Sequence, residues 1–202
     1  METSGTKRAA LGVRMHSGWG VLVAVSGDAD SLEVLERRRI VTADPAIEGA
    51  KQPYHFAESL GHREAERYLA NCRAVSGRMA FEVIKEVVGN LEARRYPIAG
   101  CAVLLASGRA LPPLPEILAS HALIHTAEGE FFRDAAKNAC QRLGVPVAAI
   151  KERDLDDRAR TVFGNEASRV QYRISSLGSS IGPPWTKDHK TAALAAAIIL
   201  AT

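Results

Sequence analysis

Residues 9–41, AALGVRMHSGWGVLVAVSGDADSLEVLERRRIV, contain three apolar segments separated by two turn signals. We predict strands at 9–15, 19–25 and 32–41. Gly18 supplies the first turn and the polar stretch 27–30 supplies the second, because glycine and aspartate favour the backbone conformations of tight turns. Segments so close in sequence pair as antiparallel neighbours, so the chain is expected to begin with a three-stranded meander.

The rest of the chain alternates between helix and strand patterns. Residues 42–56 contain two prolines and a glycine and are expected to form a loop. A helical stripe then runs to Leu91, either as one helix from about Glu58 or as two helices that meet near Gly77. The apolar runs 98–106 and 145–150 are typical of strands buried on both faces, and a predicted helix at 115–143 connects them as a parallel crossover. Further helices are predicted at 156–163, 166–174 and 187–200, with a loop at 175–186.

This order of elements predicts a single α/β domain over residues 1–202. Three antiparallel strands followed by two parallel strands pack most economically as one mixed five-stranded sheet with helices on both faces.

Composition excludes several classes of protein. With 202 residues, 47% hydrophobic and 24% charged, the chain is neither fibrous nor wholly disordered. A net charge of only +3 means that any basic contact surface must be local. Cys72, Cys101 and Cys140 lie in apolar surroundings, which is typical of reduced core thiols. The longest apolar run, 192–201, is too short to span a membrane and no leader pattern is recognised, so we expect a cytoplasmic protein without membrane contact.

Several segments of the sequence resemble motifs of the RuvC-type Holliday-junction resolvases, which belong to the ribonuclease H-like superfamily. Residues 11–14 and 18–21, LGVR and GWGV, are similar to the family's opening, in which LGID ends the first strand and TGWGV starts the second. Residues 163–171 resemble its late G-x-G-x-A-x-K-x-Q-V helix, and residues 184–197 resemble its closing D-x-x-D-A-L-A helix. The resemblance covers most of the chain in order and spacing, and it implies a ribonuclease H-like fold.

The same resemblance implies a nuclease site that this sequence lacks. In the resolvases four carboxylates hold two divalent cations, and such cations about 3.5–4 Å apart stabilise both oxygens of the phosphodiester that is cleaved. Here Arg14 stands at the first position, and residues 98–107 offer no acid for the second. Asp188 matches the third position, whereas Thr191 replaces the fourth. We therefore predict no two-metal nuclease activity, and Mg²⁺ or Mn²⁺ as a cofactor only if that activity is retained after all.

A second candidate site lies in the predicted helix between the two parallel strands. His121, His125 and Glu128 fall at i, i+4 and i+7 on its apolar stripe, so all three are expected to face inward. Two histidines one turn apart can share a metal ion, and a glutamate one turn on can complete the site or orient a ring. Together with Asp188 they define an alternative function, a metal-dependent hydrolase with a relocated catalytic site. The other interpretations are an internal hydrogen-bonded network and a helix broken near Thr126.

Several cations are candidates for binding an anion. Arg109 follows the middle parallel strand, where ligand crevices border such sheets, although a plain surface loop is the simpler interpretation. Lys187 opens the last predicted helix, whose free amides favour phosphate, and Arg169 occupies the position of the family's phosphate-contacting lysine. The candidate ligand-binding residues are Arg14, His16, Arg109, Arg169 and Lys187. In the predicted fold Arg14, His16, Arg109 and Asp188 converge at one end of the sheet as a cationic pocket.

The function favoured by these patterns is an anion or nucleic-acid binding or regulatory module. Its partner would be nucleic acid or another phosphate-bearing ligand, and the apolar helix faces leave a homodimer open. The basic run 37–39 lies on a strand expected near a sheet edge, where charge prevents aggregation and nucleic-acid contact is the alternative.

Overall fold

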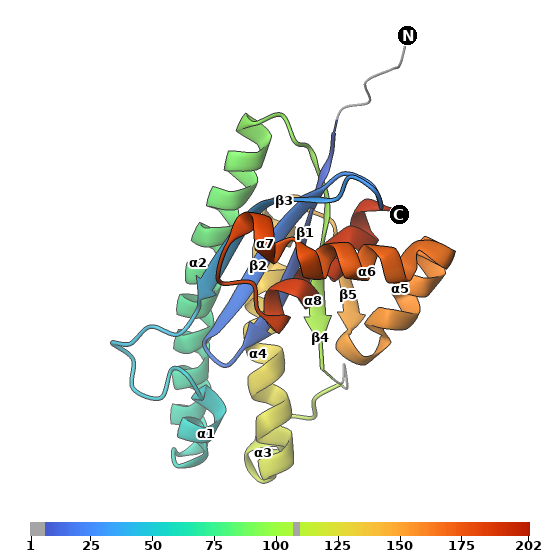
Figure 1. Cartoon of the computed structure of the whole chain (residues 1–202). Coiled ribbons are helices and arrows are strands. Elements are labelled where there is room, and N and C mark those ends of the chain that lie inside the picture. The colour runs from blue at the N-terminus through green and yellow to red at the C-terminus, as the bar shows by residue number, and fades with distance from the viewer. Residues whose placement is uncertain (1–6, 107–109) are drawn as a thin grey trace.

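The computed structural model describes residues 7–106 and 110–202 (Figure 1). Its strands are β1 (Ala9–His16), β2 (Trp19–Ser26), β3 (Glu33–Val41), β4 (Ile98–Leu105) and β5 (Val147–Lys151). Its α-helices are α1 (Pro53–Glu58), α2 (His62–Ala93), α3 (Leu114–Leu118), α4 (His121–Arg142), α5 (Leu155–Phe163), α6 (Ala167–Ser176), α7 (Gly178–Ile181) and α8 (Lys187–Leu200). Two 3₁₀ turns, η1 (Glu152–Asp154) and η2 (Gly164–Glu166), precede α5 and α6. Arg109, a predicted anion ligand, lies outside the described residues.

The five strands form one mixed sheet in the order β3-β2-β1-β4-β5, which confirms the predicted sheet. β2 runs antiparallel to both β1 and β3, whereas β1, β4 and β5 run parallel. The β1–β2 turn consists of residues 17 and 18, and Gly18 has a φ of 78° that residues with a Cβ rarely adopt. Because β1, β4 and β5 run in the same direction, their carboxyl ends lie at the same end of the sheet.

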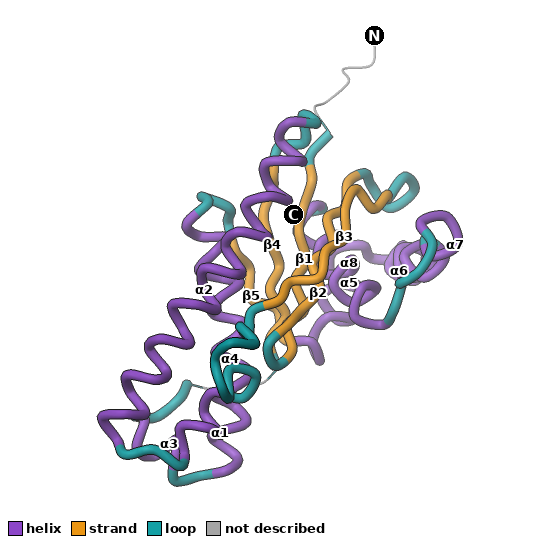
Figure 2. The backbone as a smooth tube through the Cα atoms, turned by 90° about the vertical axis from the view of Figure 1, so that its left-hand side faces the viewer, coloured by secondary structure: helices purple, strands orange, loops and turns teal. Residues whose placement is uncertain are grey.

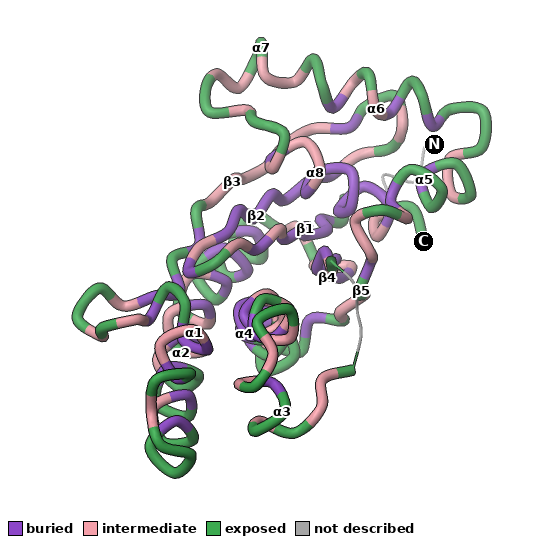
Figure 3. The backbone as a smooth tube through the Cα atoms, turned by 90° about the horizontal axis from the view of Figure 1, so that it is seen from below, coloured by how far each residue is buried: buried purple, intermediate pink, exposed green. Residues whose placement is uncertain are grey.

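Helices cover both faces of the sheet (Figures 1 and 2). On one face α1, α2 and α4 enclose a core that includes Leu11, Ile84 and Phe132. On the other face α5, α6 and α8 enclose a second core that includes Val23 and Ile174. Figure 3 shows the buried backbone concentrated in β1, β2 and β4 and in parts of the helices that cover them. No helix in the described part of the chain is long and apolar enough to cross a lipid bilayer.

α8 packs closely on β1. Alanines occupy most of the buried side of α8, and Ala192, Ala193, Ala195 and Ala196 are fully buried. On β1 the facing residue is Gly12, where a Cβ would lie 1.9 Å from the Ala192 carbonyl oxygen. The absence of a side chain at Gly12 therefore lets α8 rest directly on the central strand.

Two expected loops contain helical turns. Residues 53–56 belong to α1, because Glu128 of α4 accepts hydrogen bonds from the Tyr54 and His55 amides and holds this turn. Within the predicted loop 175–186, α7 forms where Gly178 packs so closely on Trp185 that a Cβ would lie 2.7 Å from the indole Cδ1.

For α2 the structure selects one of the two alternatives, and it divides the predicted helix 115–143 into two. α2 is continuous through Gly77, because Cys72, Ser76 and Ala80 remain buried and their packing offsets the roughly 1 kcal/mol that a helical glycine costs. The predicted helix 115–143 is interrupted at residues 119–120, where Ser120 takes an extended conformation at the N-cap position of α4. α4 continues unbroken across residue 126, which rules out the alternative of a helix broken near Thr126.

Candidate functional site

An ion-pair cluster lies where β1 ends. Arg14 Nε and Nη2 donate to the two carboxylate oxygens of Glu152 at 3.0 and 2.9 Å. Arg14 Nη1 donates to Asp188 Oδ1 at the first turn of α8. His16 Nε2 lies 3.1 Å from both Arg14 Nη1 and Asp188 Oδ2. Arg14, His16 and Asp188 thus converge as predicted, and Glu152 joins them.

The charge of this cluster differs from the prediction. Burial alone would lower the pKa of Arg14, but Glu152 and Asp188 outweigh that effect and the pKa rises. Among the described residues two carboxylates face the one guanidinium of Arg14, so its immediate surroundings are not cationic as expected, while Arg109 lies outside the described residues. The difference arises because Glu152, in η1, follows β5 and therefore lies at the same sheet edge.

The residues present do not fit the pair of divalent cations that the family resemblance implies. The Arg14 guanidinium bonds both carboxylates that remain near the family position, and it is permanently positive, so it repels a cation. Thr191 brings no negative charge to this position, and its hydroxyl donates to the Lys187 carbonyl one turn back along α8, at 2.8 Å. No reaction step through bound Mg²⁺ or Mn²⁺ follows from this arrangement.

The first turn of α8 is fixed by Thr186 and His189. His189 Nδ1 accepts hydrogen bonds from the Thr186 amide at 3.3 Å and the Thr186 hydroxyl at 2.8 Å. Burial, together with the nearby Arg37 cation, lowers the pKa of His189. The neutral imidazole is therefore the form that supports the helix start and the position of the adjacent Asp188.

We expect His189 to make stability depend on pH. Its pKa is depressed in the folded state, so the stabilisation is complete above the unfolded value near 6.5 and declines as pH falls toward the folded value. His189→Gln keeps an acceptor at the same position but does not titrate. Urea unfolding measures the free energy of unfolding at pH 8 and at pH 5. Between these pH values the wild type should lose about 1 kcal/mol more than the variant does. Equal losses in both proteins would contradict this role.

Two hollows flank the first turn of α8, and Lys187 borders both. One, of about 530 Å³, is also lined by Trp19 and by the basic residues 37–39. The other, of about 400 Å³, includes Lys190 and Gln171. Lys187 and Lys190 form no ion pair with any described residue, so both can attract an anion.

The three arginines of β3 differ in their contacts. Arg37 donates to four backbone carbonyls of residues 181–184 at 2.7–3.0 Å, so it anchors the segment before α8. Arg38 pairs with Glu36 at 2.6 Å and with Glu86 at 2.9 Å. Arg39 lies 4.0 Å above the Trp19 ring and has no acidic partner among the described residues. Of this basic run on the edge strand, Arg39 is therefore the arginine available to a ligand.

Arg169 lies apart from the ion-pair cluster. It pairs with Asp30, in the turn between β2 and β3, and with Glu166 at 3.3 Å. It lines neither hollow beside α8. Its predicted contact with phosphate therefore has no support from the positions of its neighbours.

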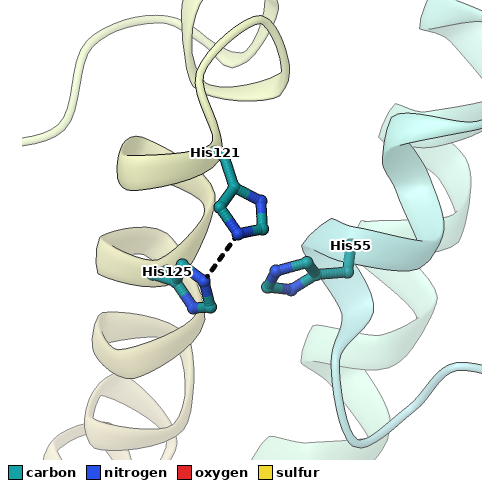
Figure 4. Close-up of side chains that lie close together, drawn as sticks. All are labelled: His55, His121 and His125. Carbon is teal, nitrogen blue, oxygen red and sulfur yellow. Dashed lines mark hydrogen bonds between the residues drawn. The ribbon is translucent and has the colours of Figure 1, made fainter.

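Three histidines form a second cluster, between α1 and α4 (Figure 4). His121 and His125, one turn apart on α4, approach to 3.0 Å between their Nε2 atoms. The His55 ring of α1 stands across from them, with centroid separations of 5.4 Å to His121 and 4.8 Å to His125. The predicted approach of the two imidazoles is thus present, and it includes a third.

The structure corrects two expectations for this cluster. Glu128 is buried as predicted, but His121 and His125 are exposed, because α4 begins at His121 and its first turns extend beyond the sheet toward α1 (Figure 1). Asp188 does not join the histidines, since its carboxylate contacts Arg14 and His16. The four residues of the hydrolase hypothesis therefore belong to two separate sites.

No protein-family model and no curated protein matches the sequence. Among solved structures, RuvC from Thermus thermophilus in complex with Holliday junction substrate aligns over 95% of this chain and 91% of its own, with 16% identity and a TM-score of 0.47. Another Thermus thermophilus RuvC structure aligns over 95% and 92%, with 15% identity and a TM-score of 0.48. An Aquifex aeolicus member of the Ppx/GppA family aligns over 77% and 39%, with 11% identity and a TM-score of 0.37.

Three antiparallel strands followed by two parallel strands, in one sheet covered by helices on both faces, form the architecture that the sequence resemblance predicted. The order and directions of its strands are those of a ribonuclease H-like fold. This fold explains why Arg14, Glu152 and Asp188 meet although they are far apart in the sequence. Arg14 lies near the end of β1, and Glu152 follows β5. Asp188 lies in the first turn of α8, the helix that packs on β1.

Two functional candidates of this ribonuclease H-like domain were missing from the sequence-based prediction. Glu152 could have been predicted, because it comes just after a predicted parallel strand. Residues in that position border ligand crevices, and the same argument identified Arg109 as a candidate. His55 had none, since it lies in a stretch whose prolines and glycine predict a loop. Only the tertiary contact with Glu128 of α4 places His55 beside His121.

Proposed function

We propose that this chain is a RuvC-like protein that binds nucleic acid without the two-metal nuclease activity of the resolvases. The observation that carries the proposal is the Arg14 guanidinium, which bridges Glu152 and Asp188 at the family's catalytic position. A fixed cation there removes the negative cradle that two divalent ions need, while it leaves the scaffold around it intact.

The proposed contact surface is the rim of the first turn of α8, consisting of Trp19, Arg39, Lys187 and Lys190. Arg39 and the two lysines are cations without an acidic partner among the described residues, and they border the two hollows beside α8. Such side chains suit phosphate groups, and the Trp19 ring, which lies against His16 and Arg39, adds an apolar edge for a sugar. The family resemblance of the sequence favours nucleic acid over a small phosphate compound as the ligand.

Charge reversal on this rim tests the proposal. Fluorescence anisotropy with a labelled four-way DNA junction and a matched duplex should show binding by the wild type that weakens as salt rises. The double variant Arg39→Glu/Lys187→Glu should bind at least about 10-fold more weakly, and its salt slope should be smaller by about 0.9 for each lost phosphate contact. Lys85→Glu, on α2 across the sheet, is the matched control and should bind as the wild type does. Equal weakening by the control would place the contact elsewhere.

Two further expectations accompany this function. We propose a cytoplasmic location, supported by the three cysteines, which are buried and free in a chain without disulfides among its described residues. The homodimer stays a prediction, which light scattering of the purified protein would test.

A further inference from the structure

The histidine cluster has the dimensions of a metal site. One ring nitrogen from each of His55, His121 and His125 lies within 4.8 Å of those of the other two. A tetrahedral ion with nitrogen ligands at about 2.0–2.1 Å holds those nitrogens roughly 3.3 Å apart. The His121–His125 pair, at 3.0 Å, is already near that spacing, so modest rotations of these two exposed rings toward His55 would complete it. The two α4 histidines are exposed, which gives an ion an entry path.

Glu128 prepares one of these rings for a ligand. Its Oε1 lies 3.2 Å from His55 Nδ1 and also accepts the Tyr54 and His55 amides at 2.8 and 3.1 Å. A carboxylate at Nδ1 fixes the proton there, so Nε2 keeps its lone pair. His55 Nε2 has no hydrogen-bond partner among the described residues. Glu128 is only 3% exposed, and its contacts set both the position and the tautomer of His55.

A network without an ion explains this arrangement less completely. One imidazole can donate to the other, which accounts for the His121–His125 contact. It does not account for a third ring, brought from another helix and held by a buried carboxylate with its second nitrogen free. Histidines that bind a metal through one ring nitrogen usually donate the N–H of the other nitrogen to a carboxylate, as His55 does to Glu128.

We propose that His55, His121 and His125 bind one divalent transition-metal ion of the zinc class, with water at a fourth position. Imidazole nitrogens suit zinc and its transition-metal neighbours, whereas Mg²⁺ and Ca²⁺ require oxygen ligands. Three protein ligands leave one position open, and the open side faces solvent. Glu128 is the positioning residue of this site. The inference is independent of nucleic-acid binding at the α8 rim, because the two sites share no residue.

Cobalt titration of the untagged full-length chain tests the site directly. After treatment with a chelator, the wild type should take up one Co²⁺ per chain with the visible absorption of a four-coordinate ion, and Zn²⁺ should displace it. His121→Ala and His125→Ala should each weaken binding by more than the roughly 10–100-fold that loss of an outer-sphere partner causes. Both residues are exposed, so circular dichroism should show folded variants with unchanged melting temperature in the absence of metal.

Two controls separate the site from general effects. His62→Ala removes an exposed histidine of α2 that pairs with Glu66, and it should leave Co²⁺ binding unchanged. Glu128→Gln should lower the affinity about 10–100-fold without removing the absorption band. No stoichiometric uptake by the wild type, or an equal loss in His62→Ala, would overturn the proposal and leave the histidines as a hydrogen-bonded network.

Discussion

Arg14→Met is expected to lower the free energy of unfolding by about 2–3 kcal/mol. The substitution leaves Glu152 and Asp188 without the guanidinium that bonds both, so two carboxylates at one sheet edge lose their common partner. Breaking a fully buried ion pair costs about 3–5 kcal/mol, whereas an exposed pair contributes about 0–1 kcal/mol. The side chains of Arg14 and Asp188 are 18% and 21% exposed, which places this cluster between those limits.

Urea unfolding at neutral pH measures this loss, and two further variants identify its cause. Arg14→Met/Glu152→Gln/Asp188→Asn should regain part of the stability, because no charge remains unpaired. Arg160→Met breaks an ion pair whose side chains are 66% and 74% exposed, and it should change stability by less than about 1 kcal/mol. An Arg14→Met protein as stable as the wild type would show that the cluster does not hold β1, β5 and α8 together.

Gly12→Ala is expected to destabilise the protein more strongly still. The added methyl would lie 1.9 Å from the Ala192 carbonyl oxygen and 2.8 Å from its carbon, and backbone atoms of α8 cannot rotate away. The loss should exceed the roughly 1–3 kcal/mol of an ordinary overpacked core, because α8 must move off the central strand. At about 2–4 °C per kcal/mol for a chain of this size, the melting temperature should fall by about 10 °C or more.

Thermal unfolding followed by circular dichroism measures this effect. The matched control is Gly89→Ala, since Gly89 lies within α2 and a Cβ there would meet no atom within 4 Å. That change should raise stability by about 0.5–1 kcal/mol, the ordinary gain of alanine over glycine in a helix. A Gly12→Ala protein that melts with the wild type would mean that α8 does not rest on β1 as closely as described.

Much of the fold follows from local pattern. The three antiparallel strands, the two parallel strands and α8 were predicted within a few residues, because apolar runs and glycine turns act over short distances. The two helices that were not predicted, α1 and α7, have a common cause. α1 and α7 are short helical turns in segments that favour loops, and each packs on a side chain outside its own turn, Glu128 of α4 for α1 and Trp185 for α7. Sequence periodicity carries no information about such partners.

The candidate sites likewise contain some residues that the sequence predicts and others that only the tertiary structure identifies. Arg14 and Asp188 were identified because the resemblance to the resolvases assigns their positions, and the predicted sheet brings them together. Their charge balance was mistaken, since Glu152 is added only when β5 is in place. His121 and His125 were paired by helical spacing, but their exposure depends on where α4 begins relative to the sheet. His55 required the tertiary structure.

The central claim is that Arg14 has replaced the metal-dependent nuclease chemistry of this fold. Its most direct test is incubation of the wild-type chain with a four-way DNA junction in Mg²⁺ or Mn²⁺, with Asp188→Asn as the parallel sample and strand breaks read on a denaturing gel. The account predicts a bound but intact junction with the wild type in either ion. Metal-dependent cleavage by the wild type that is lost in Asp188→Asn would contradict it.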